Sequence, residues 1–305
     1  MCGLVGYYCF GTERPDRQEF IRMLTACQVR GTHATGLAWL DNEGTPNIIK
    51  AGMRATEFIK SKEFKGLVLP RVLIAHTRWG TKGSEHDNKN NHPLYDKGGL
   101  IIAHNGVVKN DDLIFERKGY QRDGQVDSEV ILRVVAQYID KGITKAVKST
   151  SIIDGPFAVS MLSRKYPDKL VLFAHDNPIE IAYDKDKDIL YYGSTRAIIN
   201  AGFIEKIRGF EFNKKALDNL HYTGVSDDEC MIIGKGGVEK KFYFYDEDKV
   251  LKAKDDEKML CTNCLEKFPG AEMSSYNEKT KRGLCTGCMV LKSDIPNYKS
   301  RGLYQ

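Results

Sequence analysis

Apolar and polar residues alternate in short runs along most of the chain, and this pattern predicts many strands and fewer helices. Between residues 1 and 245 these runs are rich in branched and aromatic side chains and are bounded by glycine, aspartate and asparagine. Short polar turns such as Asp184–Asp188 join several runs, which favours antiparallel pairing. The expected strands are Leu4–Cys9, Ala34–Leu40, Arg71–Thr77, Leu100–His104, Phe157–Leu162, Leu170–Ala174, Ile179–Tyr183, Ile189–Tyr192, Cys230–Ile233 and Val238–Tyr245.

Helical periodicity is clearest over Asp127–Lys141, where the apolar residues fall on one face and Gly142 follows as a stop. Shorter patterns predict three further helices, at Arg17–Val29, Asp111–Lys118 and Thr195–Ala201. We expect Asn110 to cap the second of these and Gly119 to end it. The balance of elements predicts an α+β fold, in which helices cover two sheets.

The composition changes after residue 245 and divides the chain. Residues 246–258 are charged and poor in aromatic side chains, so we expect a charged linker or, as the alternative, a solvated helix there. A cysteine-rich segment follows at 259–290, and a polar tail occupies 291–305. The sequence therefore predicts one large domain over residues 2–245 and a small module behind it.

The bulk composition is that of an ordinary globular protein, with 305 residues, 41% hydrophobic, 29% charged and a net charge of +5. Neither an apolar run of membrane-spanning length nor a signal peptide is present, so no membrane association is expected. Eight cysteines without a secretory signal favour the reducing cytoplasm, where thiols act as ligands or nucleophiles. A solvated surface explains the small positive charge, so nucleic acid is not an expected partner.

Cys2 is the first candidate for chemistry. The chain opens Met1-Cys2-Gly3, and removal of Met1 would leave a thiol and a free α-amine on one residue. The amine, with a reference pKa near ~8, can take the thiol proton, so Cys2 would be a nucleophile that carries its own base. The alternative is that Cys2 is an ordinary buried residue at the start of the strand Leu4–Cys9.

Polar groups also gather at the ends of three expected elements, where active sites commonly lie. Arg78 offers a planar fork that grips an α-carboxylate in two places. Asp127 can hold an α-ammonium, while the Asn105 amide and the Gly106 N–H can point at an oxyanion. These groups would hold an amino acid with an amide side chain at one end and attack it at the other. The segments are His76–Gly83, Ala103–Val107 and Asp127–Val130.

Each of these residues also has a structural alternative. Arg78 could form a surface ion pair, and Asn105-Gly106 could make a hairpin turn. Asp127 could only cap its helix, and Trp79 could only pack. Loop-holding hydrogen bonds, rather than catalysis, are expected of His76, His92 and His104. These alternatives do not account for the joint occurrence of the motifs.

Taken together, the motifs resemble the class II glutamine amidotransferase domain of the N-terminal-nucleophile hydrolase superfamily, as in the glutaminase domain of glucosamine-6-phosphate synthase. The resemblance covers roughly residues 2–210, with the motifs in the family's order. It implies a four-layer α-β-β-α sandwich of two mainly antiparallel sheets. The matching segments are Cys2–Gly6, Arg30–Gly36, His76–Gly83, Asn91–Pro93, His104–Gly106 and Asp127–Glu129.

The resemblance also implies a role for each matching residue. Cys2 would be the nucleophile with its α-amine as the base, and Asn105 and Gly106 would form the oxyanion hole. Substrate would be bound by Arg78 at the carboxylate, by Asp127 at the α-amino group, and by Trp79 and Thr81 as pocket walls. Two positions depart from the family pattern, since His33 replaces a usual Asp and Lys82 a frequent His. Both changes could retune the pocket, but neither removes a residue that the mechanism requires.

The C-terminal segment carries two Cys-x-x-Cys pairs, Cys261 with Cys264 and Cys285 with Cys288, separated by 20 residues. This spacing predicts a zinc-ribbon-like module in which four thiolates hold a structural Zn²⁺. So short a segment cannot build a sufficient apolar core, so the metal would supply much of its folding free energy. The alternative is a redox pair, but no thioredoxin-like context surrounds either motif. Buried thiols are expected at Cys9, Cys27 and Cys230.

The resulting functional prediction is hydrolysis of the L-glutamine side-chain amide to glutamate and ammonia through a Cys2 thioester, without a cofactor for that chemistry. Residues 210–258 are too few for a sugar isomerase, phosphoribosyltransferase or synthetase domain. We therefore expect the ammonia to pass to a separate acceptor synthase, with the zinc module as the docking surface. The alternatives are a stand-alone amide or γ-glutamyl hydrolase and a non-catalytic zinc-ribbon binding protein on an amidotransferase scaffold.

Overall fold

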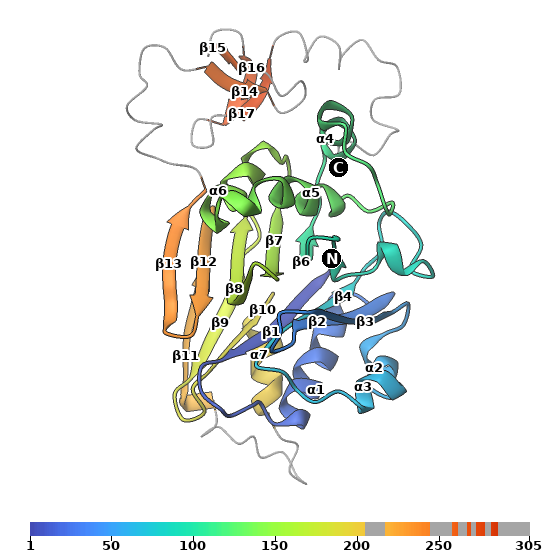
Figure 1. Ribbon diagram of the computed structural model, residues 1–305, viewed down its shortest axis with the longest axis vertical. Coiled ribbons are helices and arrows are strands. Elements are labelled where there is room, and N and C mark those ends of the chain that lie inside the picture. Colours follow the sequence, from blue (N-terminus) through green and yellow to red (C-terminus); the bar gives the residue numbers. More distant parts are fainter. Residues whose placement is uncertain (205–216, 245–257, 262–266, 270–272, 278–281, 286–305) are drawn as a thin grey trace.

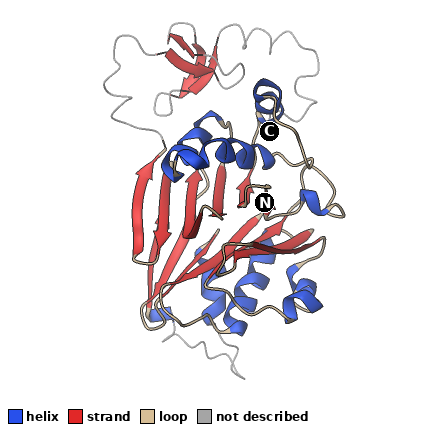
Figure 2. Cartoon of the chain, in the orientation of Figure 1, coloured by secondary structure: helices blue, strands red, loops and turns tan. Residues whose placement is uncertain are grey.

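A computed structural model describes residues 1–204 and 217–244, together with four short strands between 258 and 285. Residues 1–204 and 217–244 form two antiparallel sheets (Figure 2). The first sheet contains β1 (Gly3–Cys9), β2 (Ala34–Leu40), β3 (Pro46–Ala51), β4 (Val72–Arg78), β9 (Ile179–Asp184), β10 (Ile189–Gly193) and β11 (Leu220–Val225). Its strand order is β11-β9-β10-β1-β4-β2-β3.

The second sheet has the order β13-β12-β8-β7-β6-β5. Its strands are β5 (Leu94–Tyr95), β6 (Leu100–Gly106), β7 (Phe157–Ser163), β8 (Tyr166–His175), β12 (Glu229–Gly234) and β13 (Gly237–Tyr243). All neighbouring strands of both sheets pair antiparallel.

Helices cover the outer face of each sheet (Figure 1). The first sheet is covered by α1 (Arg17–Cys27), α2 (Ala55–Phe58), α3 (Lys62–Lys65) and α7 (Arg196–Phe203). The second is covered by α4 (Asp111–Lys118), α5 (Glu129–Tyr138) and α6 (Ile143–Lys148). This arrangement confirms the predicted α+β fold of two sheets between two helical layers.

Three apolar cores hold the layers together, one under each helical layer and one between the sheets. The central strand β1 is apolar throughout because both of its faces are covered. Val5 and Tyr7 face the helices of the first sheet, while Leu4 and Tyr8 face the second sheet. A strand that is covered on both faces must be apolar at successive positions, because either face would otherwise bury polar groups.

Helix ends differ from the sequence prediction in ways that matter for the site. The predicted helix Asp127–Lys141 is too long, since α5 begins at Glu129 and its last turn, Ile139–Lys141, is a 3₁₀ helix. Asp127 is therefore outside the helix. Asn110 occupies the N-cap position of α4, but its side chain bonds Asp154 N and Ile152 O instead of the helix.

Several elements were not predicted. Within residues 1–244 the strands are β3, β5 and β11, and the helices are α2, α3 and α6; the four strands β14 to β17 of the C-terminal segment were not predicted either. The strand β3 lies at the edge of its sheet and is only partly buried, so it lacks a strong apolar pattern. No helix in the described part of the chain is long and apolar enough to cross a membrane.

The C-terminal segment contains a separate four-stranded sheet with the order β15-β14-β17-β16. Its strands are β14 (Lys258–Cys261), β15 (Lys267–Pro269), β16 (Met273–Asn277) and β17 (Arg282–Cys285). Two of the four predicted zinc ligands, Cys264 and Cys288, lie outside the described residues, as do residues 246–257 of the predicted linker and the tail 291–305.

Candidate active site

One pocket, of about 380 Å³, is lined by all seven residues that the sequence assigns to catalysis or to glutamine binding. They come from the start of β1, the end of β4 and the loop after it, the end of β6, and the segment before α5. Both sheets thus contribute to one site. These residues are Cys2, Arg78, Trp79, Thr81, Asn105, Gly106 and Asp127.

Cys2 lines this pocket and is held by one backbone donor and one side-chain donor. Its Sγ accepts a hydrogen bond from Trp79 N at 3.4 Å, and its carbonyl accepts one from Arg30 Nε at 2.8 Å. Burial raises the pKa of the Cys2 thiol above its ordinary value, because a thiolate is poorly solvated there. A nearby base is therefore needed if this thiol is to act as a nucleophile at neutral pH.

Arg78 is buried and bonds only neutral acceptors among the residues described. Its guanidinium donates to the carbonyls of Lys82 and Gly83, the latter at 2.8 Å, and to Asn91 Oδ1 at 3.3 Å. No carboxylate in the described ranges forms an ion pair with it, so the surface-pair alternative is wrong. Burial lowers the pKa of Arg78 from its ordinary value. A buried cation without a counter-ion favours an anionic ligand.

Asp127 is the complementary group, a carboxylate that is only 8% exposed. Its Oδ2 accepts from Val108 N at 2.7 Å and its Oδ1 from Ser128 N at 2.9 Å. No cation in the described part of the chain forms an ion pair with it. The pocket thus offers one buried positive and one buried negative charge, which matches the zwitterionic end of an α-amino acid.

Asn105 and Gly106 end β6 and pair with β7, opposite Ala158 and Phe157. They do not form a hairpin turn, so that alternative is wrong. The Asn105 Nδ2 donates to Ser194 Oγ at 3.4 Å, and the same Oγ accepts from Leu4 N at 2.8 Å. Ser194 therefore links the end of β6 to β1, which begins directly after Cys2.

The three histidines are buried, and two of them, His92 and His104, line the pocket. His76 stacks on His92 with ring centroids 4.4 Å apart, and His104 N donates to His92 Nδ1 at 3.1 Å. His104 Nδ1 lies 2.7 Å from Ser128 Oγ, beside Asp127. Burial lowers the pKa of His76 to about 3 and that of His104 to about 4, and it lowers the pKa of His92 as well. These contacts agree with the predicted structural role.

The two positions that depart from the family pattern both support the loop after Arg78. His33 stacks on the Trp79 ring at 4.7 Å, and its Nδ1 accepts from Gly80 N at 2.9 Å. Lys82 Nζ forms an ion pair with Asp111 at 2.9 Å. Gly31 lets the backbone of Arg78 approach closely, because a Cβ at position 31 would lie 2.3 Å from the Arg78 carbonyl carbon.

Three residues with contacts in this site were not predicted to have a role. Arg30 belongs to a matching segment, so the resemblance could have indicated it. Ser194 and Asn177 lie in no motif, and their only sequence signal is a polar side chain two or three residues after an apolar run. The three other described thiols, at Cys9, Cys27 and Cys230, are buried as expected.

The sequence of this chain is similar to the sequences of known enzymes. Glutamine–fructose-6-phosphate aminotransferase (isomerizing) of Clostridium acetobutylicum is 28% identical over 257 residues, which are 83% of this chain and 38% of that protein. The enzyme of the same name from Bacteroides thetaiotaomicron is 27% identical over 244 residues, 73% of this chain and 38% of the relative. The chain thus spans little more than a third of these curated relatives. No protein-family model matches it.

The fold has solved counterparts as well. Glutamine phosphoribosylpyrophosphate amidotransferase from B. subtilis superposes with a TM-score of 0.61 at 19% identity, over 85% of this chain and 51% of that one. The resemblance to the class II glutamine amidotransferase domain is confirmed. A second solved structure, described as the allosteric regulatory enzyme of purine biosynthesis, has a TM-score of 0.62 at 20% identity and the same coverage. The amidotransferase-like part is the two-sheet body, where all the matching motifs lie.

Proposed function

We propose that this chain is a glutamine amidotransferase that hydrolyses the side-chain amide of L-glutamine to glutamate and ammonia. The observation that carries the proposal is that Arg78 and Asp127 both line the pocket that contains Cys2. A zwitterionic α-carbon end fits these two buried charges, which have no counter-ion among the described residues. The amide end of glutamine then extends toward the thiol.

In the proposed reaction Cys2, once Met1 is removed, gives its thiol proton to its own α-amine and the sulfur adds to the amide carbon. The carbonyl electron pair moves to oxygen, where Asn105 Nδ2 and Gly106 N–H stabilise it. The C–N bond then breaks, and the leaving nitrogen takes the proton from the ammonium to leave as ammonia. Water attacks the thioester, releasing glutamate and restoring the thiol.

The decisive experiment combines N-terminal mass with a glutaminase assay. We expect a protein that lacks Met1 and releases glutamate from glutamine, and we expect Cys2→Ala to lower kcat by at least about 10⁴-fold. Cys27→Ala, at a buried thiol outside the pocket, is the matched control and should keep the wild-type rate per folded molecule. Retention of Met1, or activity that survives Cys2→Ala, would contradict the mechanism.

We also propose that the ammonia serves an acceptor synthase on a separate protein. The sequence relatives are named as aminotransferases, and this chain matches 38% of their length. The test is to measure the glutaminase rate of the purified chain alone. Slow turnover that a co-purifying synthase accelerates supports the proposal. Full turnover with ammonia released into solution would instead support a stand-alone amide hydrolase.

For the C-terminal segment we propose a structural Zn²⁺ held by Cys261, Cys264, Cys285 and Cys288. The backbone gives partial support, because β14 and β17 are parallel neighbours in which Cys261 lies opposite Gly283, two residues before Cys285. Four thiolates would complete a tetrahedral shell and leave no catalytic position. We expect one zinc per chain by elemental analysis, lost in Cys261→Ser, while Cys230→Ser keeps it. Zinc-free wild-type protein would contradict this assignment.

A further inference from the structure

We propose that Asn177 is a positioning residue for the oxyanion hole, through the peptide unit that joins Asn105 to Gly106. This inference rests on the proposed glutaminase function. Asn177 Nδ2 donates to the Asn105 carbonyl oxygen at 2.7 Å. The residue lies 72 positions away in the sequence, yet it lines the same pocket as Cys2 and Gly106.

The planarity of the peptide explains how this bond reaches the reacting atoms. The Asn105 carbonyl and the Gly106 N–H belong to one trans peptide unit, so they point in opposite directions. Fixing the carbonyl therefore fixes the direction of the N–H. The same bond draws electron density toward the carbonyl oxygen, which makes the N–H a stronger donor.

Gly106 is a position where an additional hold on the peptide plane matters. Its φ is +151°, and a Cβ there would lie 2.1 Å from the Pro156 carbonyl oxygen. The position thus requires glycine, whose backbone rotates more freely than that of any other residue. Gly106 has no side chain that could anchor the peptide plane, so the Asn177 donor adds a second hold to the pairing of Asn105 and Gly106 with β7.

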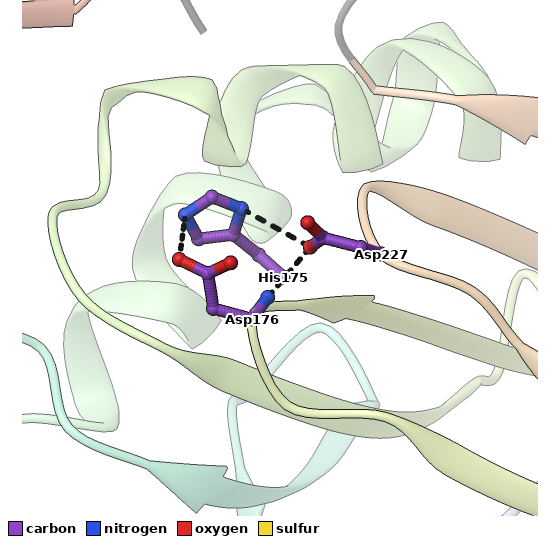
Figure 3. A group of neighbouring side chains, drawn as sticks. All are labelled: His175, Asp176 and Asp227. Carbon is purple, nitrogen blue, oxygen red and sulfur yellow. Dashed lines mark hydrogen bonds and ion pairs between the residues drawn. The ribbon is translucent and has the colours of Figure 1, made fainter. Parts of the chain in front are cut away.

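Asn177 itself is held in place by a pair of neighbouring turns. It lies at 176–178, where the chain passes from β8 in the second sheet to β9 in the first. The adjacent turn, 226–228, passes between the same sheets from β11 to β12. Figure 3 shows the contact between them, in which Asp176 N donates to Asp227 Oδ1 at 2.7 Å and His175 lies between the two carboxylates.

A further contact ties this pair of turns together. His175 Nδ1 lies 2.6 Å from Asp228 Oδ1, and both Asp176 and Asp228 adopt left-handed backbone conformations, with φ of +52° and +59°. Such conformations persist where the surroundings impose them. The side chain of Asn177 is consequently presented to β6 from a fixed point, instead of sampling the positions that a free turn would allow.

A positioning role predicts a specific kinetic signature. Removal of an oxyanion donor typically lowers kcat by about 10²–10³-fold, and misalignment of one of two donors costs less. For Asn177→Ala we expect kcat to fall about 10-fold, with KM for glutamine within twofold of wild type, because Arg78 and Asp127 are untouched. Asn177→Asp keeps the shape but replaces the donor by an acceptor, so its kcat should fall at least as far.

Asn47→Ala is the matched control. Its Nδ2 also donates to a backbone carbonyl, that of Thr45 at 3.0 Å, but outside the pocket. It should leave kcat unchanged. All three variants should keep their melting temperature within about 2 °C of wild type, since each changes one partly exposed side chain. If Asn177→Ala does not fold, the near-isosteric Asn177→Asp decides.

A second measurement separates positioning from mere support. In an aldehyde analogue of glutamine, the Cys2 sulfur would add to the carbonyl carbon, and the thiol proton would end on the oxygen of the tetrahedral adduct. That oxygen would occupy the oxyanion hole, whereas the product glutamate would place no tetrahedral centre there. We expect Asn177→Ala to weaken binding of the aldehyde about 10-fold and binding of glutamate less than twofold.

The outcomes are distinguishable. Suppose that glutaminase activity depends on Cys2 but that Asn177→Ala keeps the wild-type kcat and the wild-type affinity for the aldehyde. This result would overturn the positioning role and leave the glutaminase function intact. Equal weakening of aldehyde and glutamate would also overturn it. Absence of Cys2-dependent glutamate release in the wild-type protein would overturn the proposed function, and this assignment with it.

Discussion

The two ends of the pocket are built in different ways. The clamp end, Arg78 and Asp127, consists of buried charges that are held by groups nearby in the sequence, at most 19 residues away. The oxyanion end, Asn105 and Gly106, consists of neutral groups whose partners lie 72 and 89 residues away. In the proposed mechanism, the charges select the substrate, and the long-range hydrogen bonds set the geometry of the reaction.

The largest expected effect is the loss of stability at acid pH that the three buried histidines of the site cause. Their folded pKa values lie below the ordinary value of about 6.5, so the unfolded chain binds more protons between these values. The contribution of these histidines to the free energy of unfolding is therefore fully present above pH 6.5 and is lost as the pH falls toward 4. Each histidine should contribute up to about 1.4 kcal/mol per pH unit to that loss. Denaturant unfolding at several pH values measures the slope.

A substitution isolates one histidine's share of this slope. His104→Gln should reduce the acid slope of the free energy of unfolding by up to about 1.4 kcal/mol per pH unit, whatever its effect at pH 7. His86→Gln is the control, because the His86 side chain is 84% exposed. An unchanged slope in His104→Gln would show that His104 already titrates normally in the folded protein.

At the oxyanion end, Asn105→Ala should lower kcat by about 10²–10³-fold and leave KM for glutamine nearly unchanged. The amide donor acts on charge that develops only in the transition state, so its loss weakens that state selectively. Steady-state kinetics with glutamine separates the two parameters. A rise in KM with unchanged kcat would place Asn105 at the clamp and remove the contrast between the two ends.

At the clamp end, Arg78→Lys should show the opposite signature, with KM about 10–100-fold higher and a smaller change in kcat. Lysine keeps the charge but loses the two-pronged geometry that suits a carboxylate. Arg54→Lys is the matched control, at an exposed arginine whose side chain forms an ion pair with Glu57 and no other among the described residues. If kcat falls and KM does not change, Arg78 does not bind the ground-state carboxylate.

The smallest effect is expected from Lys82→Met, because its ion pair with Asp111 is half-exposed and Asp111 keeps a second partner in Arg122. The loop that holds Arg78 through its carbonyls loses one anchor, so KM should rise about two- to threefold at low salt. High salt should abolish the difference from wild type. Lys109→Met, at an exposed lysine, controls for the loss of one positive charge.

Much of the fold was predictable because most strands are buried on one or both faces. Successive apolar residues in Leu4–Cys9 and alternating ones elsewhere indicate burial directly. Weak patterns hid the edge strand β3 and the short helices, whose formation depends on neighbours. The end of α5 was misjudged because apolar periodicity continues through Ile139, although the backbone there tightens into a 3₁₀ turn.

By itself, the sequence determined which chemistry is available at Cys2, Arg78, Asn105 and Asp127, because residue types and their order along the chain carry that information. Only the tertiary structure decided that Arg78 and Asp127 are buried without counter-ions in the described chain, since burial depends on all four layers. It alone brought Asn177 and Ser194 to Asn105. Such contacts join single polar residues across two sheets, and no local pattern records which strands become neighbours.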